Sequence, residues 1–134
     1  MSTTGNLAML NIICRILLAL IGAGALLIAA QAWMQPDHLA GQIGFMLVGD
    51  LGHSSFRADI GGFFAASGIF MLLAAVRGER QFVLPPLVLL GLALAGRLAT
   101  AAQTGFITAY MQPITIEVVT LVVLLLAWTQ FRRA

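Results

Sequence analysis

The sequence predicts an all-α membrane protein whose four transmembrane helices form an antiparallel bundle. Three observations support this prediction. Hydrophobic residues make up 60% of the 134 residues and charged residues only 9%, a composition that cannot cover a water-facing surface. The mean hydropathy is +1.00. The apolar residues fall into four stretches, each long enough to cross a hydrocarbon core of about 30 Å, which takes roughly 20 residues of helix.

The first predicted span runs from about Ile12 to Met34. A secretory signal peptide is the alternative, because Arg15 precedes an apolar run that ends in Ala30-Gln31-Ala32, which resembles a cleavage site. The run is longer than the hydrophobic region of a signal peptide needs to be, so we favour a membrane span.

The second predicted span runs from about Arg57 to Val76 and is rich in small residues. Small side chains let helix backbones approach closely in lipid, where no hydrophobic driving force brings helices together. We therefore expect this span to be the central packing helix. Its small residues include Gly61, Gly62, Ala65, Ala66, Ser67 and Gly68.

The third predicted span runs from about Phe82 to Thr104, with Pro85 and Pro86 in its first turn, where a missing N–H costs little. The fourth runs from about Pro113 to Phe131. Residues 77–81 are too few for anything but an antiparallel hairpin between the second and third spans. The chain, residues 1–134, is thus predicted to form a single transmembrane domain.

The one long connection, residues 35–56, joins the first two spans. Its stretch from Leu39 to Leu51 is moderately apolar and contains several glycines. This pattern suits a segment that lies on, or dips into, the outer membrane interface, and it suits an ordinary ordered loop equally well. The connection also holds His38, His53 and Asp50. Their spacing matches no pattern of metal ligands, so we expect no metal.

Arginine placement predicts the orientation of the chain. The sequence has seven arginines and no lysine, and five of them fall on the side shared by the N-terminus, the second connection and the C-terminus. The positive-inside rule places this side and both termini in the cytoplasm, and loop 35–56 in the periplasm, of a bacterial-type inner membrane. The scattered arginines form no basic patch for nucleic acid. The five are Arg15, Arg77, Arg80, Arg132 and Arg133.

Aromatic residues lie near the ends of the predicted spans, where their amphipathic rings favour the headgroup boundary. They are Trp33, Tyr110 and Trp128. Asp59 is also expected near this boundary, capping the first turn of the second span. These four residues are our candidates for interface positions.

Three ionisable residues are predicted within the membrane, where charged groups are expensive and therefore informative. Arg57 opens the second span, Arg97 lies toward the outer end of the third, and Glu117 lies one turn into the fourth. All three are expected in the outer half of the bilayer. Arg97 shares a helix face with Thr100 and Thr104, so we expect this face to look toward other helices.

An ion pair between Arg97 and Glu117 is predicted, because a short outer loop joins their helices and the two charges lie at matching depth. Arg57 is a further candidate partner of Glu117. Two interpretations remain open. The cluster either locks the bundle together, or it forms an outward-opening pocket whose surplus positive charge suits an anionic lipid headgroup or substrate.

Several short motifs resemble a family of small bacterial four-span membrane proteins that is known only as a domain of unknown function. They are Arg57-Ala58-Asp59-Ile60-Gly61-Gly62, then Gly96-Arg97-Leu98, then Pro113 followed by Glu117. The family commonly has an aromatic residue where this chain has Ile60. The resemblance implies a four-helix bundle with Arg57, Arg97 and Glu117 as signature polar residues, and it implies no activity. A more distant similarity to DoxX-like membrane proteins suggests an accessory role by analogy.

No nucleophile, metal constellation or phosphate-binding loop is recognisable, so we expect neither an enzyme nor a cofactor. The leading hypothesis is a scaffold or accessory subunit that packs with copies of itself or within a larger membrane complex. The alternative is a small transporter, or a protein that binds a lipid or anion in the outward-facing Arg/Glu pocket. Against transport, 134 residues hold no inverted repeat.

Overall fold

The computed structural model describes residues 3–133 as a set of helices. Four helical stretches are long and apolar enough to cross a membrane, namely Thr4–Met34, Gly49–Arg77, Arg80–Thr104 and Thr108–Gln130. This confirms the predicted fold class, an all-helical membrane protein with four long apolar helices. The elements in chain order are α1 (Thr3–Met34), α2 (Pro36–Gln42), α3 (Gly49–Phe56), the π-helix η1 (Arg57–Gly61), α4 (Gly62–Arg77), the 3₁₀-helix η2 (Arg80–Phe82), α5 (Leu84–Thr104) and α6 (Thr108–Gln130).

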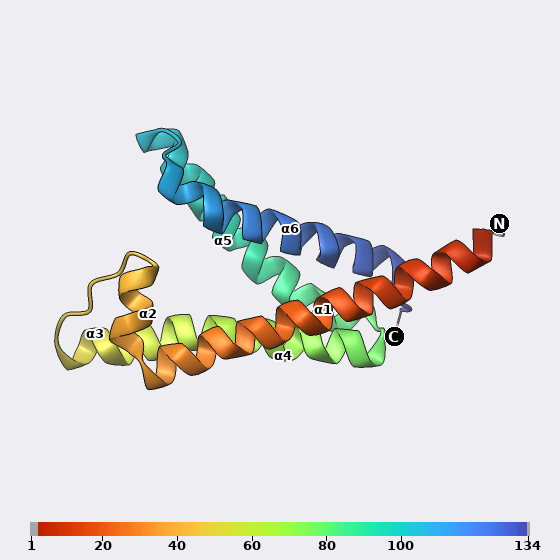
Figure 1. The fold of residues 1–134 in the computed structure, drawn as a ribbon, viewed down its shortest axis with the longest axis horizontal. Helices are drawn as coiled ribbons and strands as arrows, with labels where there is room; N and C mark the ends of the chain where they lie inside the picture. The colour runs from red at the N-terminus through yellow and green to blue at the C-terminus, as the bar shows by residue number, and fades with distance from the viewer. Residues whose placement is uncertain (1–2, 134) are drawn as a thin grey trace.

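Successive long helices run in opposite directions, so the two chain ends lie at the same end of the molecule (Figure 1). We name this the terminal end. The opposite end, which we name the loop end, carries α2, α3 and the connection between α5 and α6. Gly78 lets α4 stop at the terminal end, because it adopts a left-handed conformation with φ of 64° and its N–H bonds the carbonyl of Ala74.

Close packing of α1 against α4 depends on two glycines that face one another. A Cβ atom on Gly68 would lie 2.7 Å from the carbonyl oxygen of Gly22, and a Cβ atom on Gly22 would lie 3.0 Å from that of Gly68. The first distance is too short for a real side chain, and the second is tighter than nearly all real Cβ contacts. The small residues of the second span therefore do allow the close approach that the sequence suggested.

The main core lies where all four long helices meet, in the half of the molecule near the terminal end. It includes Leu18 of α1, Met71 of α4, Leu90 of α5 and Leu124 of α6. A second, smaller core lies beneath α2 at the loop end, and it consists of Ala32, Leu39, Ala40 and Phe56. The main core joins α1 to α4, and the smaller core joins α1 to α2 and α3.

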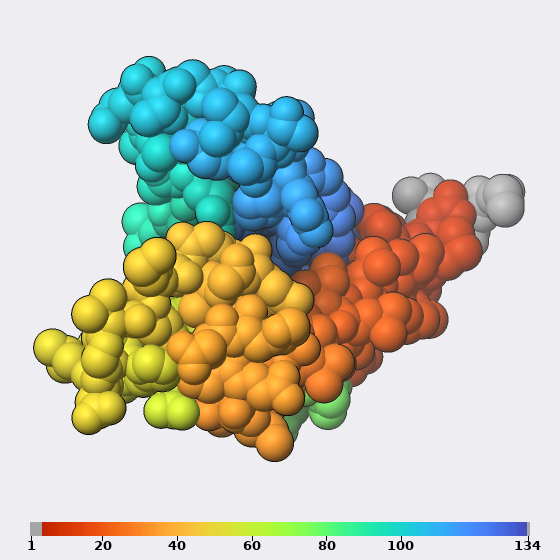
Figure 2. All heavy atoms as spheres, turned by 60° about the vertical axis from the view of Figure 1, so that its left-hand side comes forward, coloured from red at the N-terminus to blue at the C-terminus, as the bar shows by residue number. Residues whose placement is uncertain are grey.

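Toward the loop end, α5 and α6 diverge from α1 and α4 (Figure 1). None of residues 92–119, within the part of the chain that the structure describes, belongs to either core. We name this segment, the outer parts of α5 and α6 with their connection, the α5–α6 arm. In a space-filling view the arm forms a lobe of its own above α2 and α3 (Figure 2).

The second helical stretch begins at Gly49, two turns earlier than the expected start at Arg57. The expected loop 35–56 accordingly contains α2 and α3. The glycines of α3 and its polar residues Asp50, His53, Ser54 and Ser55 have low helix propensity. Tertiary contacts outweigh it, because Phe56 is buried in the smaller core. Asp59 lies inside η1, exposed and without a capping hydrogen bond, so it does not cap a first turn as expected.

The fourth helix also begins earlier than expected, at Thr108, and Pro113 lies within it. The connection from α5 is therefore only residues 105–107. Pro85 and Pro86 do lie at the start of α5. There, the backbone N–H groups have no partner within the helix, so proline is tolerated.

Candidate functional site

Arg97 and Glu117 form an ion pair between α5 and α6, as the sequence predicts. Arg97 Nε donates to Glu117 Oε1 across 2.8 Å. The short connection, residues 105–107, sets the register of the two antiparallel helices, and this register brings the two side chains to one level. Among the described residues this contact is the one ion pair in the outer parts of α5 and α6, and it helps to hold the two helices together.

The two partners of this ion pair differ in their surroundings. The Glu117 side chain is 10% exposed and the Arg97 side chain is 46% exposed. Glu117 Oε2 is buried and has no hydrogen-bond partner within residues 3–133. Because Arg97 bonds through Nε alone, its two terminal nitrogens remain available on the open side of the arm.

Thr100 and Thr104 share a helix face with Arg97, but their hydroxyls do not join the ion pair. Each hydroxyl donates to the carbonyl four residues earlier, Gly96 for Thr100 at 3.1 Å and Thr100 for Thr104 at 3.0 Å. The Thr104 hydroxyl also lies 3.3 Å from the Tyr110 hydroxyl, near the tip of the arm. These residues thus support local helix structure at the tip.

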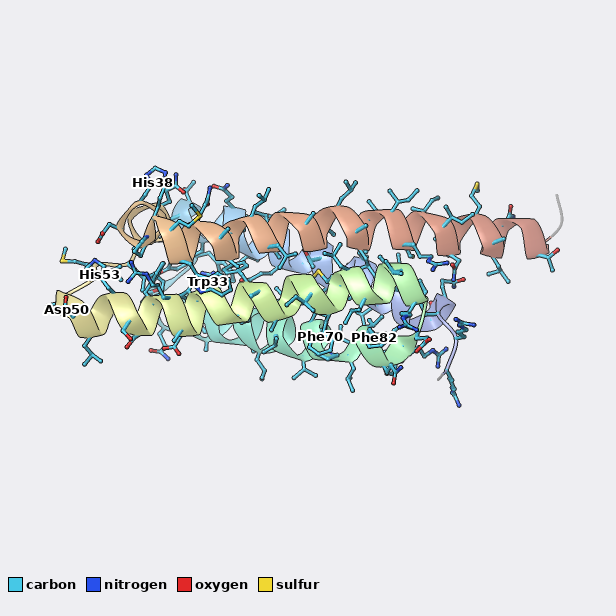
Figure 3. All side chains as sticks on the ribbon, turned by 90° about the horizontal axis from the view of Figure 1, so that it is seen from below. Trp33, His38, Asp50, His53, Phe70 and Phe82 are labelled. Atoms are coloured by element: carbon cyan, nitrogen blue, oxygen red, sulfur yellow. The ribbon has the colours of Figure 1, made fainter. Side chains whose placement is uncertain are left out.

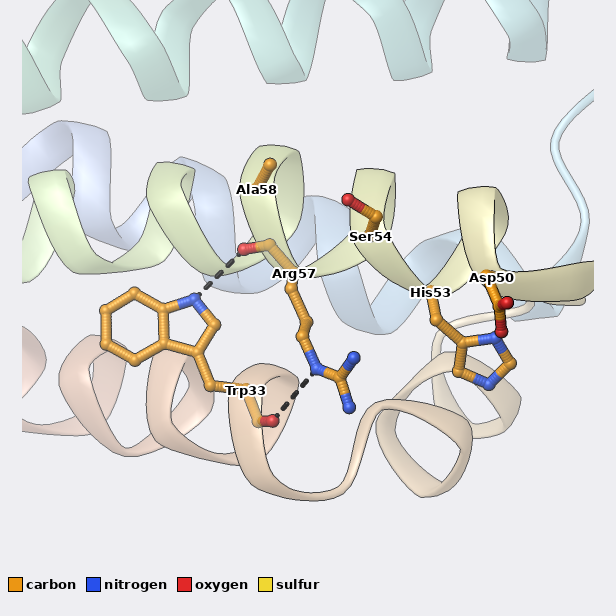
Figure 4. Close-up of a pocket in the computed structure, with 6 residues that line it drawn as sticks. All are labelled: Trp33, Asp50, His53, Ser54, Arg57 and Ala58. Carbon is orange, nitrogen blue, oxygen red and sulfur yellow. Dashed lines mark hydrogen bonds between the residues drawn. The ribbon is translucent and has the colours of Figure 1, made fainter.

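Arg57 makes its contacts with Trp33 at the end of α1. Arg57 Nε donates to the carbonyl oxygen of Trp33 at 3.1 Å, and Trp33 Nε1 donates to the carbonyl oxygen of Arg57 at 3.0 Å (Figure 4). Each residue therefore satisfies a backbone oxygen of the other. Together they fasten the loop end of α1 to η1.

The expected single cluster of Arg57, Arg97 and Glu117 is divided between two parts of the molecule. Arg57 lies on η1, while Arg97 and Glu117 lie in the α5–α6 arm, which diverges from η1 (Figure 1). In the described chain Arg57 forms no ion pair with Glu117. The position of each residue along its span predicts its depth in the membrane. The divergence of the arm, by contrast, depends on packing between helices that are distant in the sequence.

The π-helix η1 and Gly61 shape the surroundings of Trp33. A Cβ atom on Gly61 would lie 2.7 Å from Trp33 Cδ1, so the indole ring occupies space that only glycine leaves free. Single π-helical turns inside α-helices frequently occur at functional sites. Here the π-turn runs from Arg57 to Gly61 and presents both residues to Trp33.

A pocket of about 670 Å³ opens beside Arg57 at the loop end. We name it the Arg57 pocket. Figure 3 shows three of its lining residues, Trp33, Asp50 and His53, gathered at this end of the molecule. Four of the lining residues come from one face of a helix, with spacing i, i+3, i+4 and i+7. The pocket is lined by Trp33, Asp50, His53, Ser54, Arg57 and Ala58.

His53 ties α3 to α2 through one ring nitrogen and bonds within α3 through the other. Nε2 lies 2.8 Å from Asp37 Oδ1, and Nδ1 lies 2.8 Å from the carbonyl oxygen of Gly49. Both partners are acceptors, so both bonds form together only when each ring nitrogen carries a hydrogen, as in the imidazolium. The positive charge of His53 is then balanced by Asp37.

Two charged groups in the Arg57 pocket have no charged partner among the described residues. Asp50 forms no hydrogen bond or ion pair there, and Arg57 bonds only through Nε. The two terminal nitrogens of Arg57 point into the space between it and His53 (Figure 4). The pocket thus combines one available guanidinium with one available carboxylate.

No group of three or more His, Cys, Asp or Glu side chains within residues 3–133 is placed to hold a metal ion. His38, which the sequence places in the same loop as His53, instead lies 3.1 Å from the side-chain nitrogen of Gln42. The contacts of both histidines are therefore within the loop-end segment itself.

Arginines at the terminal end bond the last carbonyls of neighbouring helices. Arg15 donates to the carbonyls of Ala75 and Val76 at the end of α4. Arg80 donates to the carbonyl of Phe131 at 3.0 Å, and its guanidinium lies 5.7 Å from the ring centre of Trp128. These contacts satisfy helix ends that would otherwise lack partners.

Sequence reasoning missed Asp50 and His53 as parts of a site, because it placed them in a loop. Their i, i+3, i+4, i+7 spacing with Ser54 and Arg57 was the available signal, and it has meaning only if the segment is helical.

No family model, curated protein or solved structure matches this chain. The resemblance to the four-span family therefore rests on its motifs alone.

Proposed function

We propose that this multi-pass membrane protein is a non-enzymatic subunit of a larger membrane assembly, and that it attaches to a second membrane-spanning chain through the α5–α6 arm. The four apolar helices place the chain in contact with the lipid bilayer. The second chain is either another copy or a different protein. The DoxX-like similarity of the sequence favours the same role by analogy.

The half-exposed side chain of Arg97 is the observation that carries this proposal. Its side chain is 46% exposed within a helix long enough to span the membrane. Charged side chains within spans almost always face other helices or water-filled cavities, because exposure to hydrocarbon is costly. A neighbouring chain that covers the arm would supply acceptors for the two terminal nitrogens of Arg97.

The arginines of the terminal end motivate the proposed location. Arg15, Arg77, Arg80 and Arg132 lie close together there, since Arg15 bonds the end of α4 and Arg132 bonds the carbonyl of Arg77. By the positive-inside rule, this end faces the cytoplasm of a bacterial-type inner membrane.

Gentle solubilisation followed by mass analysis tests the proposal. We expect a second chain, foreign or identical, to co-purify in fixed stoichiometry. Thr100→Trp, which adds bulk beside Arg97, should remove that chain, whereas Leu20→Trp on the exposed surface of α1 should retain it. A monomeric wild type under several mild detergents would contradict the proposal.

A second candidate function is the binding of an anionic lipid or small anion, and the Arg57 pocket favours it. Arg57 offers two terminal nitrogens to a pocket of about 670 Å³, and planar guanidinium groups match phosphate oxygens well. Loss of a retained anion in Arg57→Gln, with unchanged melting temperature, would support this function.

A further inference from the structure

We infer that the Arg57 pocket binds a phosphate ester that carries a primary amine, which is the chemistry of a phosphoethanolamine headgroup or of its water-soluble glycerol ester. This inference rests on the second function proposed above, anion binding at Arg57, and adds the class of ligand. It follows from the charges of the pocket, their spacing and the rigidity of Arg57.

The available charges of the pocket complement a zwitterion. When His53 is protonated, its charge and that of the Asp37 carboxylate balance each other across 2.8 Å. Arg57 and Asp50 remain, one positive and one negative, and each lacks a charged partner among the described residues. A plain anion would satisfy only Arg57, whereas a ligand with both a phosphate and an amine would satisfy both groups.

The spacing of the two groups suits a ligand that bridges them. Asp50 and Arg57 are seven residues apart on one helix face, which separates them by roughly 10 Å along the axis. This separation is too large for a direct ion pair, which needs a distance of about 4 Å. A phosphate on the guanidinium and an ammonium on the carboxylate, joined by two carbons, would fill the interval past His53 (Figure 4).

Arg57 is held in place before any ligand arrives. Its Nε is fixed on the carbonyl oxygen of Trp33 at 3.1 Å, and Trp33 in turn fills the space left by Gly61. The terminal nitrogens are therefore presented as a fork, the geometry in which arginine binds phosphate through two oxygens. Trp33 lies in the last turn of α1, a position where indole rings favour the level of lipid headgroups.

The nature of the amine separates this ligand from other headgroups. A primary ammonium donates hydrogen bonds to the Asp50 carboxylate, whereas the trimethylated nitrogen of choline has no N–H to donate. The glycerol headgroup of phosphatidylglycerol has no positive charge. Both of these lipids would therefore bind through Arg57 alone.

Native mass spectrometry of the full chain in nanodiscs tests the inference. The probes are phosphatidylethanolamine, phosphatidylglycerol and phosphatidylcholine, offered in equal mixtures. We expect the wild type to retain phosphatidylethanolamine about tenfold more tightly than the other two, because one charge-assisted hydrogen bond distinguishes them. Equal retention of the three lipids by the wild type would overturn the amine assignment but leave anion binding at Arg57 in place.

Variants separate the two halves of the ligand. Asp50→Asn should bring phosphatidylethanolamine down to the level of phosphatidylglycerol, and Arg57→Gln should weaken retention of all three lipids. Asp59→Asn is the matched control, because Asp59 is an exposed carboxylate of the same helical stretch that does not line the pocket. If Arg57→Gln retains lipid as the wild type does, anion binding itself fails. An unchanged preference in Asp50→Asn would refute the bridging role of Asp50.

Glycerophosphoethanolamine distinguishes a lipid from a soluble source of the ligand. If this ester displaces retained phosphatidylethanolamine, the pocket recognises the headgroup chemistry by itself and a soluble ligand is supported. If only the lipid is retained, the pocket takes the headgroup from the membrane. If neither compound is held more tightly than phosphatidylglycerol, the inference is wrong. Melting temperatures of each variant serve as the control for folding.

Discussion

Trp33 and Arg57 exchange hydrogen bonds, because the side chain of each donates to the backbone carbonyl of the other, at 3.0 and 3.1 Å. Two residues that are 24 positions apart are thus locked together where α1 ends and the π-helix η1 begins. This pair of hydrogen bonds, which we call the Trp33–Arg57 lock, requires that no atom lie between the indole ring and η1. Gly61, which faces the ring, is therefore a position sensitive to substitution.

Gly61→Ala should therefore displace Trp33. The new Cβ atom would lie 2.7 Å from Trp33 Cδ1, so we expect a loss of about 1 to 3 kcal/mol in unfolding free energy and a changed Trp33 fluorescence spectrum, measured in a Trp128→Phe background. Gly62→Ala is the control, since no atom lies within 4 Å of a Cβ there. An unaltered spectrum in Gly61→Ala would refute the lock.

The ion pair between Arg97 and Glu117 should respond asymmetrically to mutation. Arg97→Leu leaves a buried carboxylate without a partner and should cost about 3 to 5 kcal/mol. Glu117→Leu should cost less, because the half-exposed Arg97 can extend toward the headgroups. The double variant should recover much of the larger loss, as thermal or denaturant unfolding in detergent can measure. Additive losses would show that the two side chains do not interact.

Gly68 should be the least replaceable glycine between α1 and α4. Gly68→Ala would place a Cβ atom 2.7 Å from the carbonyl oxygen of Gly22, and backbone cannot move aside easily, so the helices must separate. We expect a loss of about 1 to 3 kcal/mol in stability. Gly24→Ala, with open space around its Cβ, should be neutral or stabilising by about 0.5 to 1 kcal/mol. Similar values for the two variants would argue against close helix contact at Gly68.

Orientation in the membrane can be tested with single cysteines in a Cys14→Ala background. Met46→Cys, at a position 89% exposed in the loop end, should react with an impermeant maleimide on intact cells. Arg133→Cys and a reporter fused after Gly78 should both read as cytoplasmic. Labelling of Arg133→Cys from outside would reverse the proposed orientation.

Hydropathy was sufficient to predict four helical spans, because each apolar run is long and the charges between the runs are few. The pairing of Arg97 with Glu117 was predictable for a related reason. A three-residue connection, 105–107, leaves little freedom in how α5 and α6 align. Local constraints of this kind can be read from a single sequence.

The position of Arg57 could not be predicted in this way. Its neighbours depend on how far the α5–α6 arm diverges and on an extra residue in the π-turn, and neither has a clear signal in composition or periodicity. The helix that starts at Gly49 could not be predicted for a different reason. Its glycines and polar residues have low helix propensity, and the burial of Phe56 that stabilises it involves residues of α1 and α2.

The length of α1 has a mechanical consequence. Its 32 residues extend about 48 Å, and a tilt of roughly 50° would be needed to fit them within a hydrocarbon layer about 30 Å thick, beyond the usual range for membrane helices. The stretch from Arg15 to Met34 alone matches the layer, so the first three turns must overhang it at the terminal end. Because the helix is unbroken from Thr3 to Met34, this overhang is rigidly connected to the last turn of α1, where Trp33 bonds Arg57. A displacement of one end of α1 would therefore be transmitted to the other.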